Sequence, residues 1–249
     1  AGTAWANPKR AKADWTVLFY TAADNNLEGV LVRLMNEVEA IGSTDEVNFV
    51  AAVDRHPGYY SGSGDWSDTR YFRLEQDSNL FLLTSPVLVE LGELNTGRAE
   101  TLQEFIEWGI TEFPARHYAL VISDHGGGWQ GASADETSDD QMISSAGLGH
   151  AIGNALGNVG LDKLDLIVFN ACLMGQLEVW SLLAPYADYG VASEEITYGM
   201  DGLSWVMRNL VDDPNLSPEE VGRQLVQAFG DANSRLERGA TLTMSVVQL

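Results

Sequence analysis

The chain has 249 residues, 45% of them hydrophobic, and a net charge of −22 from 36 acidic and 14 basic side chains. This length suits one large α/β domain or two small ones. A surface this acidic repels the phosphate backbone of nucleic acids, which argues against nucleic-acid binding. The apolar runs are much shorter than the roughly 20 residues that span a bilayer, so no membrane segment is predicted. We interpret the charge as a solubility or salt-adaptation feature, and attraction of basic peptides or divalent cations is the functional alternative.

The first predicted elements form a βαβ unit. An apolar run over 15–22 predicts a strand, and apolar residues then recur at helical spacing up to Gly42. Asn25 or Asn26 is the expected N-cap of this helix. A second strand is predicted over 46–54, which implies a parallel pair with a right-handed crossover.

The middle of the chain is more varied. Segments 69–77 and 81–93 are typical of short edge strands or of a hairpin outside the main sheet. A helix is predicted over 101–113 and a strand over 117–123. Residues 126–147 then form a long polar loop, and loops of this length are usually functional or disordered.

The remaining residues alternate between helix and strand. Helices are predicted over 148–159, 175–183, 203–211 and 217–236, and strands over 164–170, 187–193 and 241–249. The pattern indicates an α/β fold whose mostly parallel six-stranded sheet is sandwiched by helices, with a small peripheral hairpin. Ligands of such sheets bind beyond the carboxyl ends of the strands. His125 and Cys172 each follow a predicted strand, so both should lie on this functional edge.

Cys172 is the only cysteine, so it cannot form an internal disulfide, and a structural zinc site would need more Cys or His. It is therefore either a small buried core residue or a nucleophile. A histidine nearby would supply the base and later the acid, and the helix expected just after Cys172 would favour a thiolate. Gly126 to Gly128 let the backbone approach a substrate and direct N–H groups at an oxyanion. Together these features indicate acyl transfer from a peptide.

Three other functions are disfavoured by the motifs. HGGGW at 125–129 is similar to the oxyanion loop of lipases, but the chain has no fitting G-x-S-x-G elbow. DNNLEG at 24–29 opens like an EF-hand loop, but the twelfth position is Met35 instead of Glu. The turn after the first strand lacks the glycines of a nucleotide site. No metal site is predicted from these patterns.

Four stretches resemble the clostripain family of cysteine peptidases in order and spacing: WTVLFYTAADNNLE, ELGELNTGRAETLQEFIEW, YALVISDHGGGW and LDLIVFNACLMGQLEVWSLLAPYADYGVASEE. The resemblance spans about residues 15–249 and implies the fold of caspases, gingipains and legumain. It implies a cysteine endopeptidase whose substrates are peptides or proteins. By this resemblance Cys172 is the nucleophile, His125 is the base, and the Gly126 amide holds the oxyanion with the Cys172 amide.

The resemblance also indicates where the substrate side chain would bind. Thr197 and the acidic residues near it are expected at the entrance of the P1 pocket. The family usually has Asp two residues before the nucleophile, where it binds Arg or Lys, but this chain has Asn170. A neutral amide binds a cation less strongly, so a preference for Arg or Lys would need Asp201 or Glu194 to supply the charge. Trp129 either walls the site or lies on the surface.

The sequence leaves the route of activation and the cofactor open. Relatives are often activated by cleavage at a basic residue between the His and the Cys, and here only Lys163 is available. The chain is therefore either not cut there or prefers a non-basic residue. Some relatives use Ca²⁺, which is the one cofactor considered, although no cluster in the sequence marks a site. The non-enzymatic alternative is a catalytically silent caspase-like domain that binds peptides.

Residues 1–14 are expected to form an N-terminal tail, and residues 15–249 one peptidase domain, truncated or processed at its C-terminus. The first residues are small and polar, unlike a signal peptide, which fits a cytoplasmic protein or a mature chain without its leader. We favour a secreted or periplasmic location. The oligomeric state is not predicted.

Overall fold

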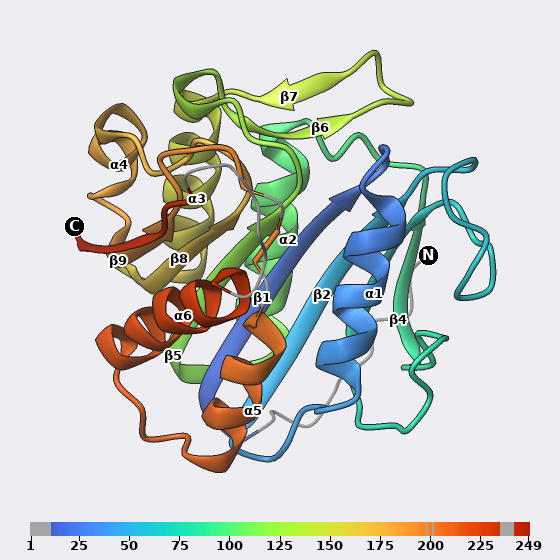
Figure 1. Cartoon of the computed structure of the whole chain (residues 1–249), viewed down its shortest axis with the longest axis horizontal. Coiled ribbons are helices and arrows are strands. Elements are labelled where there is room, and N and C mark those ends of the chain that lie inside the picture. Colours follow the sequence, from blue (N-terminus) through green and yellow to red (C-terminus); the bar gives the residue numbers. More distant parts are fainter. Residues whose placement is uncertain (1–10, 198, 201, 235–241) are drawn as a thin grey trace.

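The computed structural model describes residues 11–197, 199–200, 202–234 and 242–249. Its centre is an eight-stranded sheet in the order β10-β9-β8-β5-β1-β2-β3-β4 (Figure 1). Strands β9, β8, β5, β1 and β2 are parallel, while β10, β3 and β4 each run antiparallel to a neighbour. The strands of this sheet are β1 (Ala13–Ala23), β2 (Val47–Arg55), β3 (Thr69–Arg73), β4 (Val87–Gly92), β5 (Ala115–Ser123), β8 (Leu164–Asn170), β9 (Ala187–Ala192) and β10 (Ser245–Gln248).

Helices cover both faces of the sheet. They are α1 (Glu28–Glu39), α2 (Ala99–Glu112), α3 (Ser145–Val159), α4 (Leu177–Leu183), α5 (Leu203–Asp212) and α6 (Pro218–Asn233). Helices α1, α5 and α6 lie on the near face in Figure 1, with α2, α3 and α4 on the far face. Alternate residues of β1 enter the two cores: Leu18 and Tyr20 pack on one side, and Val17 and Phe19 on the other. None of the helices in the described ranges is long and apolar enough to cross a bilayer.

The predicted α/β fold with a mostly parallel, helix-flanked sheet is confirmed, with eight strands instead of six, and of the two readings of segments 69–77 and 81–93 the structure shows short edge strands. Strand β3 pairs with β2, and β4 pairs with β3, so the hairpin extends the main sheet instead of lying outside it. Every residue of β2 is buried, so the backbone groups along its outer edge need a partner strand, and β3 supplies it. Tyr71 and Phe72 of β3 enter opposite cores and so continue the two-faced pattern.

The long polar loop predicted over 126–147 contains local structure of its own. A short 3-10 turn, Gly128–Gln130, precedes a two-stranded ribbon of β6 (Ala132–Asp135) and β7 (Gln141–Ile143). The ribbon lies at the end of the sheet where β5 and β1 finish (Figure 1). It therefore borders the edge at which the sequence predicts the functional residues.

Helix α1 begins at Glu28 with Leu27 as its N-cap, so the predicted cap at Asn25 or Asn26 is wrong. Asn25 Oδ1 accepts a hydrogen bond from the Leu27 amide at 2.9 Å, while its Nδ2 donates to Asp124 at 2.7 Å. This local turn uses the side chain that would otherwise cap the helix. The segment between β1 and α1 is thereby fixed to the chain that follows β5.

Candidate active site

His125 and Cys172 lie beyond matched ends of neighbouring strands. Ser123, the last residue of β5, is paired with Asn170, the last residue of β8. His125 and Cys172 follow these partners by two residues each. A Cβ on Gly126 would lie 2.2 Å from the Cys172 carbonyl oxygen, a distance that side-chain carbons do not tolerate. The two strand ends are thus in direct backbone contact, and only glycine fits at position 126.

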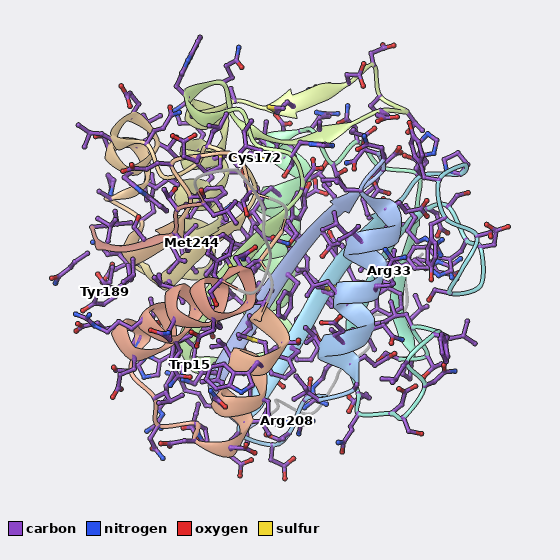
Figure 2. The ribbon with its side chains drawn as sticks, viewed as in Figure 1. Trp15, Arg33, Cys172, Tyr189, Arg208 and Met244 are labelled. Carbon is purple, nitrogen blue, oxygen red and sulfur yellow. The ribbon has the colours of Figure 1, made fainter. Side chains whose placement is uncertain are left out.

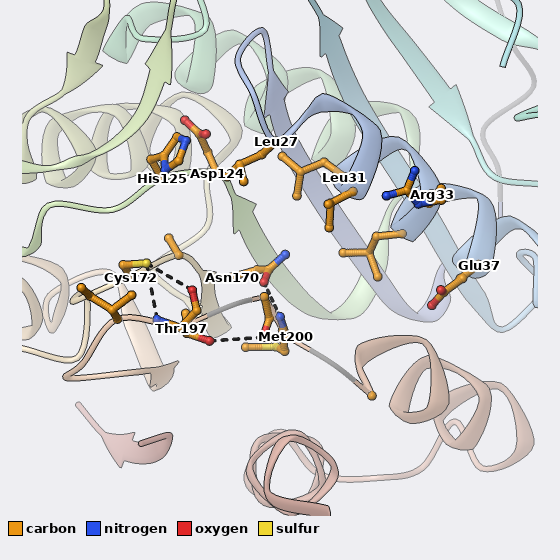
Figure 3. A pocket seen from close by; sticks show the side chains of 16 residues that line it. Leu27, Leu31, Arg33, Glu37, Asp124, His125, Asn170, Cys172, Thr197 and Met200 are labelled. Carbon is orange, nitrogen blue, oxygen red and sulfur yellow. Dashed lines mark hydrogen bonds between the residues drawn. The ribbon is translucent and has the colours of Figure 1, made fainter. Parts of the chain in front are cut away.

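A pocket of about 480 Å³ opens at this edge, and both His125 and Cys172 line it (Figure 3). One wall is the exposed face of α1. The opposite wall is formed by the described residues of the 196–202 loop, which are Ile196, Thr197, Gly199, Met200 and Gly202. The α1 wall is largely apolar, formed by Leu27, Val30, Leu31 and Leu34. The pocket therefore pairs a thiol and an imidazole with an apolar surface large enough for a long side chain.

The thiol of Cys172 is half-buried and faces the 196–202 loop. Its Sγ lies 3.3 Å from the Thr197 carbonyl oxygen, which can accept the thiol proton, and 3.4 Å from the Thr197 amide, which can donate to sulfur. The Leu173 amide donates to the Glu195 carbonyl at 3.1 Å and ties the residue just before this loop to the cysteine turn. The predicted helix after Cys172 is present as α4, but it begins at Leu177, two residues later than predicted. A turn that includes Leu173 at φ +64° separates the cysteine from the helix.

The imidazole of His125 is held from the β1 side of the site. Its Nε2 lies 2.8 Å from Asn26 Oδ1. The backbone carbonyl of His125 accepts a hydrogen bond from the Ser133 amide at 3.2 Å. The preceding residue, Asp124, is buried and accepts the hydrogen bond from Asn25 Nδ2. Burial raises the pKa of Asp124 well above its ordinary value. The histidine is therefore held at its ring by Asn26 and at its backbone by Ser133, residues from two other segments.

The amide of Gly126 is not used by the bridge that flanks it. Gly126 and Ala132 form an isolated antiparallel bridge. The hydrogen bonds of this bridge run from the Gly127 amide to Gly131 at 2.8 Å and from the Ser133 amide to the His125 carbonyl at 3.2 Å. Neither bond consumes the Gly126 N–H.

Asn170 lines the pocket, and its side chain acts as a structural brace, because it hydrogen-bonds to two neighbouring segments. Its Oδ1 accepts the Met200 amide at 2.6 Å, and its Nδ2 donates to Ser123 Oγ at 3.2 Å. The side chain is 5% exposed. Asn170 therefore connects the ends of β5 and β8 to the 196–202 loop, the loop that contacts the thiol.

The other predicted substrate-binding residues are placed differently. Thr197 lines the pocket and contacts Cys172. Glu194 is exposed and Trp129 is 67% exposed, and neither belongs to the described lining. Asp201 lies outside the described residues. Roles for these side chains in substrate binding remain predictions.

Sequence reasoning missed three residues of the site: Asn26, Arg33 and Glu37. Asn26 contacts the imidazole, and Arg33 (labelled on α1 in Figure 2) and Glu37 line the pocket. A signal was available for Asn26, because it follows the first strand at the same edge of the sheet as His125. Arg33 and Glu37 carried no such signal in the sequence, since exposed charged residues are ordinary on a helix.

One group of carboxyl side chains in the described ranges is arranged so that a metal ion could be held. Asp24, Asp54, Glu93 and Asp135 each place an oxygen atom within 4.8 Å of the others. We call these four residues the carboxyl cluster. They come from the end of β1, from β2, from the residue after β4 and from β6, so the sequence alone does not reveal their proximity.

Three comparisons with known proteins identify the family of this chain. The profile of the clostripain family matches residues 19–249. Clostripain of Hathewaya histolytica is 30% identical over 209 residues, which cover 74% of this chain and 39% of that protein. The chain thus spans well under half the length of this curated relative.

Two solved structures share the fold. A secreted C11 cysteine protease from Bacteroides thetaiotaomicron, in complex with an irreversible peptide inhibitor, superposes with a TM-score of 0.74 at 21% identity, covering 95% of this chain and 66% of that chain. An inactive zymogen C11 protease from Parabacteroides distasonis gives 0.68 at 24% identity, covering 96% and 62%. Combined with the match of the family profile over most of its length, these findings show that the chain belongs to the clostripain family.

Proposed function

We propose that this chain is a cysteine endopeptidase in which Cys172 is the nucleophile and His125 the general acid and base. The observation that carries the proposal is the pairing of Ser123 with Asn170, which brings the two residues to equivalent positions on adjacent strands around one pocket. The family membership supports the reaction class. Peptides or proteins are the proposed substrates.

In the first step His125 accepts the Cys172 thiol proton, and the sulfur attacks the carbonyl carbon of the scissile bond. The thiol would turn from the Thr197 carbonyl toward the substrate, and the Thr197 amide, 3.4 Å from Sγ, would stabilise negative charge on sulfur. The carbonyl electrons move to oxygen to form a tetrahedral oxyanion. The amides of Gly126 and Cys172 are proposed to donate to this oxyanion.

In the second step the oxyanion collapses, and the C–N bond breaks as His125 gives its proton to the leaving amine. A thioester then joins Cys172 to the acyl half of the substrate. His125 next takes a proton from water, whose oxygen attacks the thioester, and the sulfur leaves with the proton that His125 returns. The enzyme is regenerated with one peptide bond hydrolysed.

The pocket beside the sulfur would receive the P1 side chain. The apolar α1 wall suits the methylene stem of Arg or Lys, and Glu37 on the same helix adds a carboxylate to the lining. Asn170 in place of the usual family Asp makes the cation contact weaker. We therefore propose a basic P1 residue bound less tightly than the family pattern implies. A location outside the cytoplasm is part of the same proposal and follows the secreted relative.

A panel of fluorogenic peptides that differ only at P1, with Arg, Lys, Asn, Asp or Leu, tests the proposal. We expect release of fluorophore from Arg and Lys substrates and none after iodoacetamide alkylates Cys172. Alkylation of the thiol with no cleavage of any peptide would favour the peptide-binding module instead. Asn170 is the one feature that favours this second function.

A further inference from the structure

Two large apolar side chains lie exposed beside the proposed catalytic residues without lining the pocket. Trp129 is 67% exposed and Leu177 is 77% exposed. Each follows a proposed catalytic residue closely in the chain: Trp129 comes four residues after His125, and Leu177 comes five residues after Cys172. Single apolar residues are ordinary on protein surfaces, but a Trp and a Leu that adjoin next to an active site are typical of a binding surface.

The segments that carry Trp129 and Leu177 contact each other. A Cβ on Gly128 would lie 2.6 Å from the side-chain nitrogen of Gln176, so the Gly128 backbone packs directly on that side chain. Gly128 precedes Trp129, and Gln176 precedes Leu177. The contact between the 3-10 turn and α4 therefore brings the two exposed side chains to neighbouring positions on one surface. We call Trp129 and Leu177 the apolar pair.

The turn that carries Trp129 is fixed to the chain behind it. Ser145 Oγ donates to the Gly128 carbonyl at 3.0 Å. A Cβ on Gly131 would lie 1.9 Å from the Ile143 carbonyl oxygen, so the end of the turn packs on β7 with no room for a side chain. Because the backbone is already ordered, covering Trp129 with a ligand costs little conformational entropy.

The proposed reaction decides which part of a substrate passes the apolar pair. The P1 side chain enters the pocket between α1 and the described residues of the 196–202 loop. His125 must reach the leaving nitrogen to protonate it, so the substrate residues after the scissile bond pass the chain that follows His125. Gly126 to Gly128 have no side chains to obstruct this path, and Trp129 is the first side chain along it.

An extended substrate rises about 3.3 Å per residue and points successive side chains to opposite sides. One of the first two residues after the scissile bond, P1′ or P2′, can therefore place its side chain on the apolar pair. We propose that Trp129 and Leu177 form a subsite that selects a large apolar side chain, such as Leu or Phe, at P1′ or P2′. This inference rests on the proposed peptidase function and extends it to the leaving side of the substrate. The exposed Glu178 beside Leu177 disfavours Asp or Glu there.

Internally quenched peptides with Arg at P1 test the subsite, with Leu, Phe, Ser or Asp placed at P1′ and at P2′ in turn. At one of the two positions we expect kcat/KM to be about tenfold higher with Leu or Phe than with Ser, and lowest with Asp. Trp129→Ala and Leu177→Ala should each reduce this preference to about threefold or less, whereas Trp129→Phe keeps most of it. The preference is a ratio within one enzyme, so a general loss of turnover does not change it.

Leu182→Ala is the matched control, because Leu182 is another exposed leucine of α4 and lies outside the pocket lining. It should keep the full preference. A wild-type enzyme without the preference, or an equal loss in Leu182→Ala, would overturn the proposal. An unchanged preference in Trp129→Ala would also overturn it, and loss of a dimer in light scattering of that variant would then show that the apolar pair binds a second copy.

Binding to the full chain carrying Cys172→Ala separates the subsite from the proposed catalysis. Isothermal titration with the same peptides should give a dissociation constant about tenfold lower for Leu or Phe than for Ser. Trp129→Ala in the same background should remove most of this difference. Selective binding without cleavage by the wild type would support the subsite and contradict the catalytic assignment. Equal dissociation constants for all the peptides would overturn the subsite.

Discussion

His125 Nε2 lies 2.8 Å from Asn26 Oδ1, so an amide from the chain after β1 holds the imidazole that follows β5. An amide oxygen can only accept a hydrogen bond, which means that Nε2 carries the proton. Nδ1 then keeps its lone pair and is the nitrogen that, in the proposed mechanism, exchanges protons with Cys172. The same contact strengthens once the ring becomes cationic.

We predict that Asn26→Ala lowers kcat about tenfold or more and leaves KM nearly unchanged. A hydrogen bond to a charged group contributes about 1.5–3 kcal/mol, and this one is strongest when His125 holds the thiol proton. Steady-state kinetics on the best P1 substrate measure the effect.

Asn26→Asp keeps an acceptor oxygen and should retain most of the activity, which separates a positioning role from simple loss of packing. The control is Asn158→Ala, which removes an exposed hydrogen bond to Glu107 far from the pocket. Equal kcat values for Asn26→Ala and this control would refute the role of Asn26.

We predict that Cys172→Ala reduces turnover by at least about 10³-fold, because it removes the nucleophile. The fold should persist, since the change deletes one atom from a half-buried side chain. Circular dichroism and the melting temperature check the fold, and iodoacetamide should add one label to wild type and none to the variant. Residual activity close to wild type would end the assignment of Cys172.

We predict that Gly126→Ala nearly abolishes activity, by about 100-fold or more, because its Cβ would press against the Cys172 carbonyl and displace the oxyanion donors. The matched control is Gly157→Ala in α3, where a Cβ meets no atom within 4 Å. This control should stabilise the helix by about 0.5–1 kcal/mol and leave kcat intact. Comparable activity in the two variants would show that position 126 tolerates a side chain.

The sequence predicted that His125 and Cys172 lie at one edge of the sheet, because the cause of this placement is local. Each candidate residue follows an apolar strand, and parallel strands end on the same side of a sheet. The pairing of Ser123 with Asn170 is consistent with that reasoning. The sequence left the position of the hairpin open, because a short, two-faced segment such as 69–73 has the same pattern whether it pairs with the main sheet or lies apart.

The carboxyl cluster was invisible in the sequence for a different reason. Its members are separated by about 30–40 residues, and two of them, Glu93 and Asp135, enter through an antiparallel edge strand and a ribbon. Nothing in the local pattern specifies how such segments meet. Asn26 was missed although its position was predictable, because an asparagine after a strand is also an ordinary turn residue.

We predict that Asn170→Asp raises kcat/KM for Arg and Lys substrates about tenfold, since a carboxylate forms a stronger contact with a cation than an amide does. The structure accommodates the change, because Oδ1 still accepts the Met200 amide and Ser123 Oγ can donate in place of Asn170 Nδ2. Leu substrates serve as the control and should gain nothing. A uniform change across all P1 residues would argue that position 170 acts only as a brace.

We predict that the purified chain does not cut itself after Lys163. The Lys163 ammonium donates to the Ala187 carbonyl at 3.0 Å and lies 3.3 Å from the Asp188 carboxylate. The next residue, Leu164, is fully buried at the start of β8, so the bond cannot enter an active site without local unfolding. Prolonged incubation followed by intact-mass measurement should show no fragment ending at residue 163, with Cys172→Ala as the reference. A cut inside 132–145, which has no Lys or Arg, would instead show that the enzyme accepts a non-basic P1 residue.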